Sequence, residues 1–175
     1  FSQENKEERG FLFQIGGGPA SITWPSQTQQ ALNYMESYSE IDRAKIFLDI
    51  MIGSAVSENL YVVLTAQGFG DRLEDVYGDY LQLNSYLYSG GIRWYPFTTG
   101  LVLGIDAGPA RVLIDTSYAG SHTSDWGSGL GLMAGYDFNQ SKTGVSAVLG
   151  FRSNGYSVEN ESFGGASVFL NLIFK

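Results

Sequence analysis

The chain has 175 residues, enough for one domain with a sizeable core. Its formal net charge of −8, with no basic stripe, argues against a nucleic-acid partner, and the absence of cysteine excludes disulfide and thiol chemistry. Charged residues make up only 16%, against about 25% in a typical soluble domain, while aromatic residues reach 14% and glycines number 23, so the composition suits a soluble surface poorly.

Alternation of apolar and polar residues with a period of two recurs along the chain and predicts strands. Eight are expected, over residues 11–22, 43–56, 60–70, 81–96, 100–112, 127–138, 144–153 and 162–174. The polar stretch QTQQALNYMESYSEID between the first two strands is predicted to be a loop, because it lacks convincing helical periodicity. No run approaches 18 consecutive apolar residues, so no transmembrane helix is expected.

The connections between these strands alternate in length. VSEN, PFTT and NQSKT are tight polar turns, whereas residues 23–42, 71–80, 113–126 and 154–161 form longer connections. An even number of strands with this alternation is the plan of an outer-membrane barrel, with short periplasmic turns and long extracellular loops. The sequence therefore predicts an all-β, eight-stranded antiparallel up-and-down transmembrane barrel over residues 11–175, preceded by a periplasmic tail over residues 1–10.

Each strand has one face without charge and one polar face. The apolar face of strand four is taken to carry Leu81, Leu83 and Leu87, and its polar face Gln82, Asn84, Tyr86 and Tyr88. Arg93 has the opposite parity, so a β-bulge at Gly90–Gly91 is expected to restore the pattern and to turn Trp94 outward.

Two barrels are compatible with this pattern: a soluble one with the apolar face inside, and a membrane barrel with that face against lipid. Some two dozen large apolar side chains left in water would forgo about 1.5–3 kcal/mol each, far more than a net stability of about 5–15 kcal/mol. The polar face holds too few charges for a soluble surface, which favours the membrane barrel.

The charges of the polar face are predicted to pair inside the lumen, because buried charges must pair. They are Lys45, Asp49, Arg93, Asp106, Asp137 and Arg152, three of each sign. Arg93 and Asp106, on adjacent strands, are expected to belong to one network.

The other charges gather in the long connections. The acidic residues there are Glu36, Glu40, Asp42, Asp71, Glu74, Asp75, Asp79, Asp115, Asp125, Glu159 and Glu161, against Arg43, Arg72 and Arg111. A solvated acidic rim is favoured over a calcium site, because the EF-hand spacing is missing, and no metal or other cofactor is expected.

Aromatic side chains bracket the strands and predict two interfacial girdles. Phe11, Trp94, Phe97, Tyr136, Phe138 and Phe174 are expected at the short-turn end, and Trp24, Trp126, Tyr156 and Phe163 at the long-loop end.

Three segments resemble small bacterial outer-membrane barrels of the outer-membrane protein X and W type. They are the final strand GGASVFLNLIFK, the hairpin LYSGGIRWYPF…GLVLGIDAG, and GLGLMAGYDFN. The resemblance implies a bacterial outer-membrane location, outer-membrane lipid as surroundings, and recognition of the C-terminal strand by the barrel-assembly machinery.

One motif suggests chemistry. AGSHTSDWG holds the single histidine, and His122, Ser124 and Asp125 resemble the His-Ser-acid set of outer-membrane lipid A deacylases. The pattern after the serine is missing, so a solvated loop histidine is favoured and no enzyme is expected. The expected function is display of acidic loops to a host or extracellular ligand on a plugged barrel. The alternatives are a narrow conduit for small or hydrophobic solutes and, third, a lipid A hydrolase.

Overall fold

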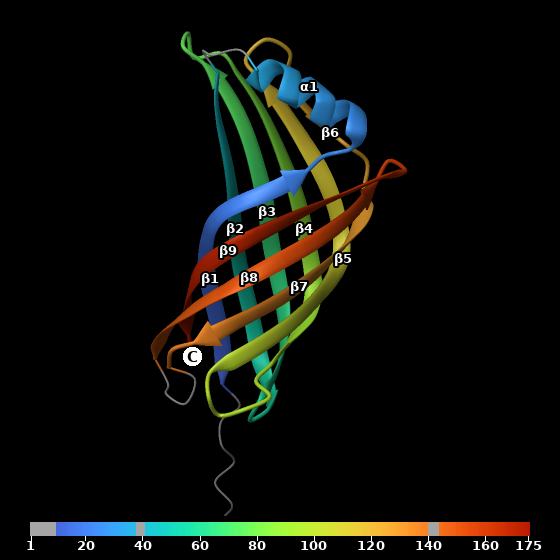
Figure 1. The fold of residues 1–175 in the computed structure, drawn as a ribbon. Helices are drawn as coiled ribbons and strands as arrows, with labels where there is room; N and C mark the ends of the chain where they lie inside the picture. Colours follow the sequence, from blue (N-terminus) through green and yellow to red (C-terminus); the bar gives the residue numbers. More distant parts are fainter. Residues whose placement is uncertain (1–9, 38–40, 140–143) are drawn as a thin grey trace, which may run out of the picture.

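The structure is a computed structural model that describes residues 10–37, 41–139 and 144–175; the expected N-terminal tail lies outside them except for Gly10. One helix and nine strands are present in this part of the chain (Figure 1). They are β1 (Phe11–Thr23), α1 (Ser26–Glu36), β2 (Ile41–Ser57), β3 (Leu60–Asp75), β4 (Tyr80–Trp94), β5 (Leu101–Thr116), β6 (Gly120–Thr123), β7 (Gly127–Asp137), β8 (Val145–Val158) and β9 (Glu161–Phe174). The described helix is too short and too polar to span a bilayer.

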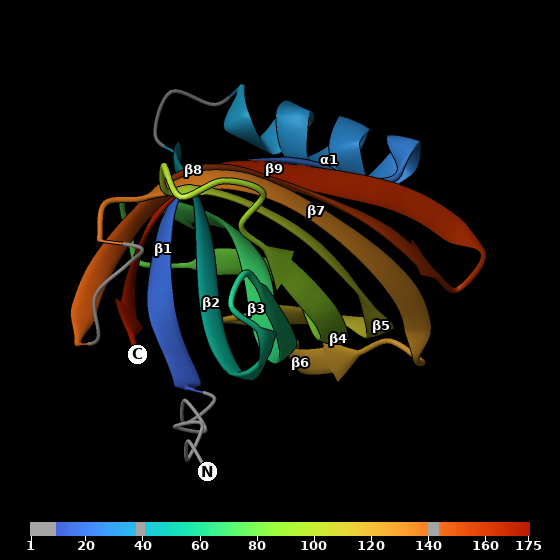
Figure 2. The ribbon, with the colours of Figure 1, turned by 90° about the horizontal axis from the view of Figure 1, so that it is seen from below.

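The strands close into an eight-stranded antiparallel barrel, as predicted. Each strand pairs with its neighbours in the order β4-β3-β2-β1-β9-β8-β7-β5, and the β4–β5 pairing closes the ring (Figure 2). β6 pairs with the far end of β5 only, so it forms a hairpin that extends one side of the barrel. Both ends of the barrel wall, Phe11 and Phe174, lie at the end with the short turns.

The outer wall is apolar. Leu48, Leu64, Leu132, Phe151 and Leu170 are each more than half exposed, and they sit on five different strands. Such side chains are stable on a surface only if that surface contacts hydrocarbon rather than water. This is the face that the alternating pattern assigned to lipid on every strand except β4.

The interior is more apolar than the sequence indicated. Its buried side chains include Leu12, Phe47, Met51, Val63, Phe69, Val102, Met133, Val148, Phe169 and Ile173. A barrel of eight strands has an interior just wide enough for side chains to fill it. Apolar groups therefore fill the lumen above and below its polar residues.

The prediction for β4 was wrong. Its buried residues are Leu83, Ser85, Leu87, Ser89 and Arg93, whereas Gln82, Asn84, Tyr86 and Tyr88 face outward. The pairing with β3 runs without a break through Gly90–Gly91, so the predicted bulge is absent. Trp94 does face outward, because an unbroken strand that buries Arg93 must expose the residue beside it.

The long connections are also shorter than predicted. β3 continues to Asp75 and β8 to Val158, so β8 and β9 are joined by only Glu159 and Asn160, which take φ values of 51° and 66°. This left-handed pair matches the two-residue hairpin turn that suits twisted strands.

The segment expected to be a loop forms α1. Pro25 precedes its first turn, and Leu32 and Met35 fall three residues apart on one helical face. Leu32 is buried and Met35 packs on the core, so contact with the barrel stabilises a helix that is otherwise polar.

Candidate functional site

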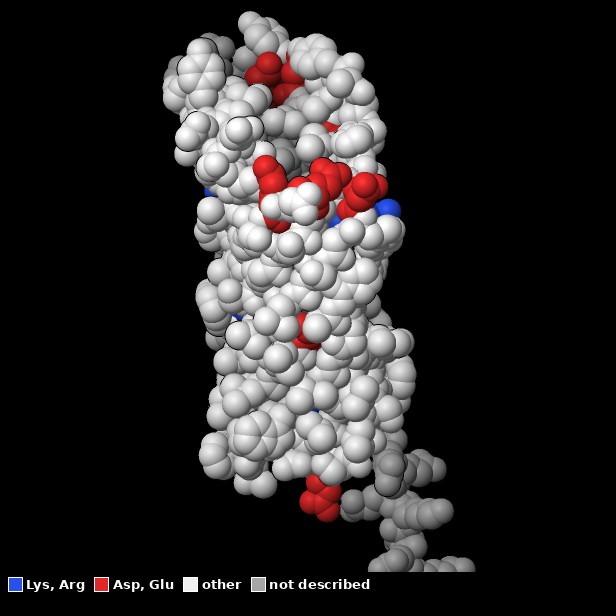
Figure 3. Space-filling model, turned by 90° about the vertical axis from the view of Figure 1, so that its right-hand side faces the viewer, with Lys and Arg blue, Asp and Glu red and all other residues white. Residues whose placement is uncertain are grey.

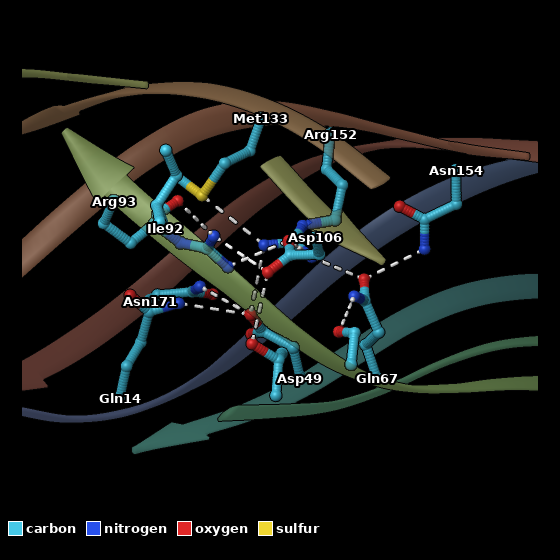
Figure 4. A network of polar contacts seen from close by, with 12 residues as sticks. Gln14, Asp49, Gln67, Ile92, Arg93, Asp106, Met133, Arg152, Asn154 and Asn171 are labelled. Carbon is cyan, nitrogen blue, oxygen red and sulfur yellow. Dashed lines mark hydrogen bonds and ion pairs between the residues drawn. The ribbon is translucent and has the colours of Figure 1, made fainter. Parts of the chain in front are cut away.

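A polar network crosses the lumen, and Asp106 on β5 is its centre (Figure 4). Arg93 Nη1 lies 2.9 Å from Asp106 Oδ1, and Arg93 Nη2 donates to Oδ2 at 3.0 Å. Arg152 Nη1 from β8 donates to the same Oδ2 at 3.1 Å. The structure thus brings together Arg93 and Asp106, which the sequence had placed on adjacent strands.

Asp49 on β2 is the second acid of this network. Gln14 Nε2 and Asn171 Nδ2 donate to its Oδ2 at 3.1 and 3.2 Å, and Arg152 Nη2 lies 4.0 Å away. With Asp106 and Arg93, the network contains two acids and two guanidinium groups and is neutral as a whole. Neutrality and dense hydrogen bonding are what allow charges to be buried at this depth.

Apolar rings complete the obstruction. Phe47 and Phe169 are fully buried beside the network, and the Arg152 guanidinium lies 5.7 Å from the centre of the Phe47 ring. Gln67 Oε1 accepts from Arg152 Nη1 at 2.5 Å and from Asn154 Nδ2 at 2.9 Å. Strands from all sides of the barrel therefore meet in one packed layer.

We expect this layer to block ions. In planar bilayers at moderate voltage, the folded protein should show no steady conductance, because Arg93 and Arg152 are fully buried in a packed layer. Single-channel recording checks this, with insertion verified separately by the heat-modifiable migration of the same sample. A stable open level carried by the folded form would contradict a sealed lumen.

The other two residues predicted for the network lie elsewhere. Asp137 sits at the short-turn end, where Lys175 Nζ lies 2.5 Å from its Oδ2 and the Tyr95 and Ser146 hydroxyls donate to it. Lys45 is half-buried on β2 nearer the other end, and it takes part in none of the ion pairs seen among the described residues. Asp137 and Lys45 therefore lie outside the network that Arg93 and Arg152 form with Asp49 and Asp106.

The end of the barrel that carries α1, called here the outer mouth, is filled by aromatic rings. Ring centres lie 5.2 Å apart for Trp24 and Phe163, 4.9 Å for Phe163 and Tyr156, and 4.8 Å for Phe69 and Phe47. Trp24 and Tyr156 are buried, and Phe163 lies half-buried between them. The prediction that these three belong to an interfacial girdle is wrong, because Tyr156 on β8 and Phe163 on β9 have the parity that points inward, and Trp24, directly after β1, is buried as well.

The remaining girdle residues do face outward. These residues are exposed by 40–63%: Phe11, Trp94, Phe97, Trp126, Tyr136, Phe138 and Phe174.

Asp71 holds the outer mouth together. The Trp24 indole N–H donates to its Oδ2 at 2.7 Å, while Arg43 donates through Nε and Nη2 at 2.8 and 2.7 Å. Arg43 Nη1 also reaches Glu36 at the end of α1, at 2.5 Å. The hydrogen bonds to Asp71 hold the pKa of the Arg43 guanidinium above its ordinary range, against the opposing effect of burial.

The prediction that Asp71 is a loop acid is wrong. Asp71 is a fully buried residue of β3, because that strand continues beyond the predicted end and the odd-numbered residues of β3 face inward. Asp71 begins a segment with three further acids, Glu74, Asp75 and Asp79, so its charge gave no sign of burial. The signal that could have found it is the odd spacing it shares with Gln67 and Phe69.

Acidic residues surround the outer mouth above the buried cluster. Figure 3 shows them gathered at one end of the barrel above a wall that is almost free of charge. Asp42, Glu74 and Asp75 lie on strand ends, Asp79 and Glu159 in turns, and Glu161 at the start of β9, whereas Glu40 lies outside the described residues.

A cavity of about 320 Å³ opens at this rim. Met35, Ile41, Leu73 and Leu81 provide apolar walls, and the acids and tyrosines around them are Glu74, Asp75, Asp79, Tyr80 and Tyr118. The Tyr118 hydroxyl donates to Asp79.

Hydrogen bonds also shape the acid chemistry of the exposed rim. The hydroxyls of Ser121 and Tyr80 donate to Asp115 and hold the pKa of that carboxyl below its ordinary value. The same contact raises the pKa of the Tyr80 phenol. Asp115 therefore remains negatively charged in moderately acidic solution.

The residues considered for hydrolysis do not form a triad. His122 is exposed on β6, and no hydrogen bond joins it to Ser124 within the described structure. The Ser124 hydroxyl accepts from the Val112 N–H at 2.9 Å and donates to the Asp125 carbonyl oxygen. A nucleophile needs a base within hydrogen-bond reach, and this serine is engaged with backbone instead. The described residues also contain no group of three or more His, Cys, Asp or Glu that could hold a metal ion.

Comparison with known proteins gives the fold. No protein-family model matches the chain, and no curated protein matches it. Neisserial surface protein A is similar in structure, with a TM-score of 0.61, 14% identity, and coverage of 94% of this chain and 96% of that one. The attachment invasion locus protein Ail of Yersinia pestis is also similar. Its complex with the heparin analogue sucrose octasulfate gives a TM-score of 0.56, 11% identity, and coverage of 94% and 97%. A second Ail structure gives 0.55, 12%, and coverage of 95% and 99%.

Proposed function

We propose that this chain, whose fold is that of the small eight-stranded bacterial outer-membrane barrels, lies in the outer membrane and binds a basic partner at its acidic outer mouth. The barrel is a rigid, plugged support in this proposal, and it carries out no catalysis. Its C-terminal strand β9 is the segment that the barrel-assembly machinery would recognise.

The charge of the outer mouth supports a basic partner. Ten described acids of this end, with Arg43, Arg72 and Arg111 as their counterparts, leave seven negative charges in excess. Arg43 is buried between Asp71 and Glu36, so it offsets only these two acids and none of the others at the rim. A field of one sign at a concave surface attracts ligands of the opposite sign and speeds their association.

The comparison with Ail also supports a basic partner, because the ligand crystallised with Ail has the opposite charge. That protein has been crystallised with sucrose octasulfate, a polyanion. The exposed acids of the present chain would repel such a ligand, so a shared fold is used here for a partner of opposite charge.

The rim cavity carries the proposal. Its apolar walls, including Leu73 and Leu81, suit one apolar side chain, and Glu74 and Asp79 beside them suit flanking lysine or arginine residues. Apolar burial provides the anchor and the carboxylates provide orientation, which is the usual division at a binding site. A basic segment with an embedded hydrophobic residue fits both.

The plugged lumen argues against the alternative of a solute conduit, because fully buried Arg93, Arg152 and Phe169 occupy its middle. No observation favours the hydrolase.

Binding of poly-L-lysine to the detergent-solubilised barrel tests the proposal. Replacing both Glu74 and Asp79 by their amides, E74Q/D79N, should weaken binding about tenfold, equivalent to about 1.4 kcal/mol. High salt should likewise weaken the binding of poly-L-lysine to the wild type, because exposed charges are screened by salt. Glu58, in the turn at the opposite end, gives a matched control, since E58Q should bind like the wild type. Equal binding by all variants, or tighter binding of sucrose octasulfate than of poly-L-lysine, would reject the acidic mouth as the site.

A further inference from the structure

Polar side chains face lipid on one strand of the barrel. Gln82, Asn84, Tyr86 and Tyr88 of β4 point outward, where every other strand presents mainly aliphatic groups. A tilted strand rises about 2.5 Å per residue along the barrel axis, so Asn84 lies about 25 Å above the girdle residue Trp94. This is the height of the apolar band of a membrane barrel, so these residues run from within the hydrocarbon up to its outer boundary.

A groove lies beside this polar stripe. Ala66, Gly68 and Gly70 of β3 form its floor, and larger side chains stand on either side, giving a volume of about 410 Å³. The walls are Ile46, Leu48 and Ile50 on β2, and Gln82, Asn84, Tyr86 and Tyr88 on β4. The groove exists because the floor residues are small: a Cβ at Gly68 would already lie 3.3 Å from the Tyr86 ring.

Two cations flank the outer end of the stripe. Arg72 lies opposite Gln82 in the β3–β4 pairing, and Arg111 lies opposite Tyr86 in the β4–β5 pairing. Glu74 occupies the Nε and Nη2 side of Arg72, at 2.9 and 2.7 Å, whereas Nη1 faces Gln82 through a long contact of 3.4 Å.

The second cation is also partly available. The Arg111 guanidinium rests 4.8 Å from the ring centre of Trp126 and its Nε is buried, whereas its two Nη atoms take part in none of the hydrogen bonds or ion pairs seen in the described part of the chain. Each of the two guanidinium groups therefore keeps donors for a further anion.

We propose that this groove binds a phosphorylated, acylated glucosamine lipid of the outer leaflet (lipid A), with one acyl chain against Gly68 and Gly70 and its two phosphates on Arg72 and Arg111. The inference rests on the proposed outer-membrane location. Two strand spacings and four residues of rise separate the two arginine Cα atoms by about 16 Å, a span that two phosphates on a disaccharide match better than the single phosphate of a glycerol lipid. The amides of Gln82 and Asn84 lie between them and suit the amide-linked acyl groups and hydroxyls of such a sugar.

Native mass spectrometry of the folded barrel tests this, after incubation with equimolar bisphosphorylated lipid A and phosphatidylglycerol. The wild type should retain lipid A in preference. Gly68→Leu, which fills the groove and needs only a small shift of the Tyr86 ring, should lower retention at least about fivefold, as should R72Q/R111Q.

The controls separate lipid binding from structure. Gly155→Leu adds the same side chain to the outer face of β8, where a Cβ meets nothing within 4 Å, and should retain lipid like the wild type. Glu74→Gln frees Arg72 and should raise retention. If the Arg72–Glu74 pair had only a structural role, E74Q and R72Q would instead both lower the retention of lipid A to a similar extent.

Three outcomes overturn the inference: equal retention of both lipids, equal behaviour of G68L and G155L, or a groove occupied by a second copy, seen as dimers that G68L abolishes. Each of these outcomes rejects the lipid site without rejecting the proposed function, provided that poly-L-lysine still binds to the outer mouth. A chain that stays dissolved and monomeric in buffer without detergent would reject the membrane location itself.

Discussion

Replacing Asp106 by alanine should destabilise the barrel by about 3–5 kcal/mol. The substitution leaves Arg93 and Arg152 facing each other inside the lumen with one carboxylate, Asp49, which lies 4.0 Å from Arg152. Removing one partner of a buried ion pair costs this much because the remaining charge has lost its solvent and its counter-charge. Urea unfolding from phospholipid vesicles, followed by tryptophan fluorescence, measures the loss.

A double variant shows that charge balance is the cause. D106A/R93M removes one acid and one base, so Arg152 and Asp49 remain as a neutral pair. It should recover part of the stability that D106A loses, although it removes more polar contacts. D115A, at a half-buried position near the outer end of the same strand, should cost much less than D106A. A double variant less stable than D106A would show that the hydrogen bonds, and not the balance of charge, dominate.

Replacing Asp71 by alanine should open the outer mouth. The Trp24 indole N–H and two Arg43 nitrogens lose their acceptor, and Arg43, with a side chain only 4% exposed, keeps Glu36 alone. We expect a loss of about 3 kcal/mol and faster hydrogen exchange across α1, because Arg43 on β2, which holds Glu36 of the helix, loses the carboxylate on β3 that fixes its position.

Hydrogen exchange resolved by residue distinguishes this from general destabilisation. The amides at the short-turn ends of β7 and β8, far from Asp71, should remain protected in D71A, whereas those of α1 should not. Glu36→Gln removes only the exposed partner and should produce a smaller increase in exchange in the same helix. Unchanged protection of α1 in D71A would mean that Leu32 and Met35 hold the helix without help from the ion pair.

Periodicity predicted most of the barrel because lipid imposes a strict rule on the outer face. Residues such as Leu48, Leu132 and Leu170 must be apolar, and alternation with a period of two reveals them directly. The closed ring and the Arg93–Asp106 pair follow from this pattern together with the rule that buried charges pair.

β4 could not be read in the same way because its two faces look alike. Leu83 and Leu87 fill the lumen while Tyr86 and Tyr88 face outward, so hydrophobicity alone pointed to the wrong parity. The parity of Arg93 indicated which face of β4 points inward, but the prediction assigned that parity to a bulge that the strand does not contain.

The helix and the outer cluster depend on tertiary contacts that local sequence does not encode. α1 has two apolar anchors, Leu32 and Met35, among polar residues, and becomes helical on the barrel rim. Asp71 and Trp24 are 47 residues apart in the sequence, and they come into contact only once the sheet has closed.

The pairing of β1 with β9 sets the order in which the protein can assemble. The seam joins β1 to β9, so the ring cannot close before β9 has been synthesised. The partners in the lumen are equally remote: Asn171 is 122 positions from Asp49, and Asn154 is 87 from Gln67. Until the seam forms, these polar groups must stay hydrated, so dehydration of the interior belongs to the last stage of insertion.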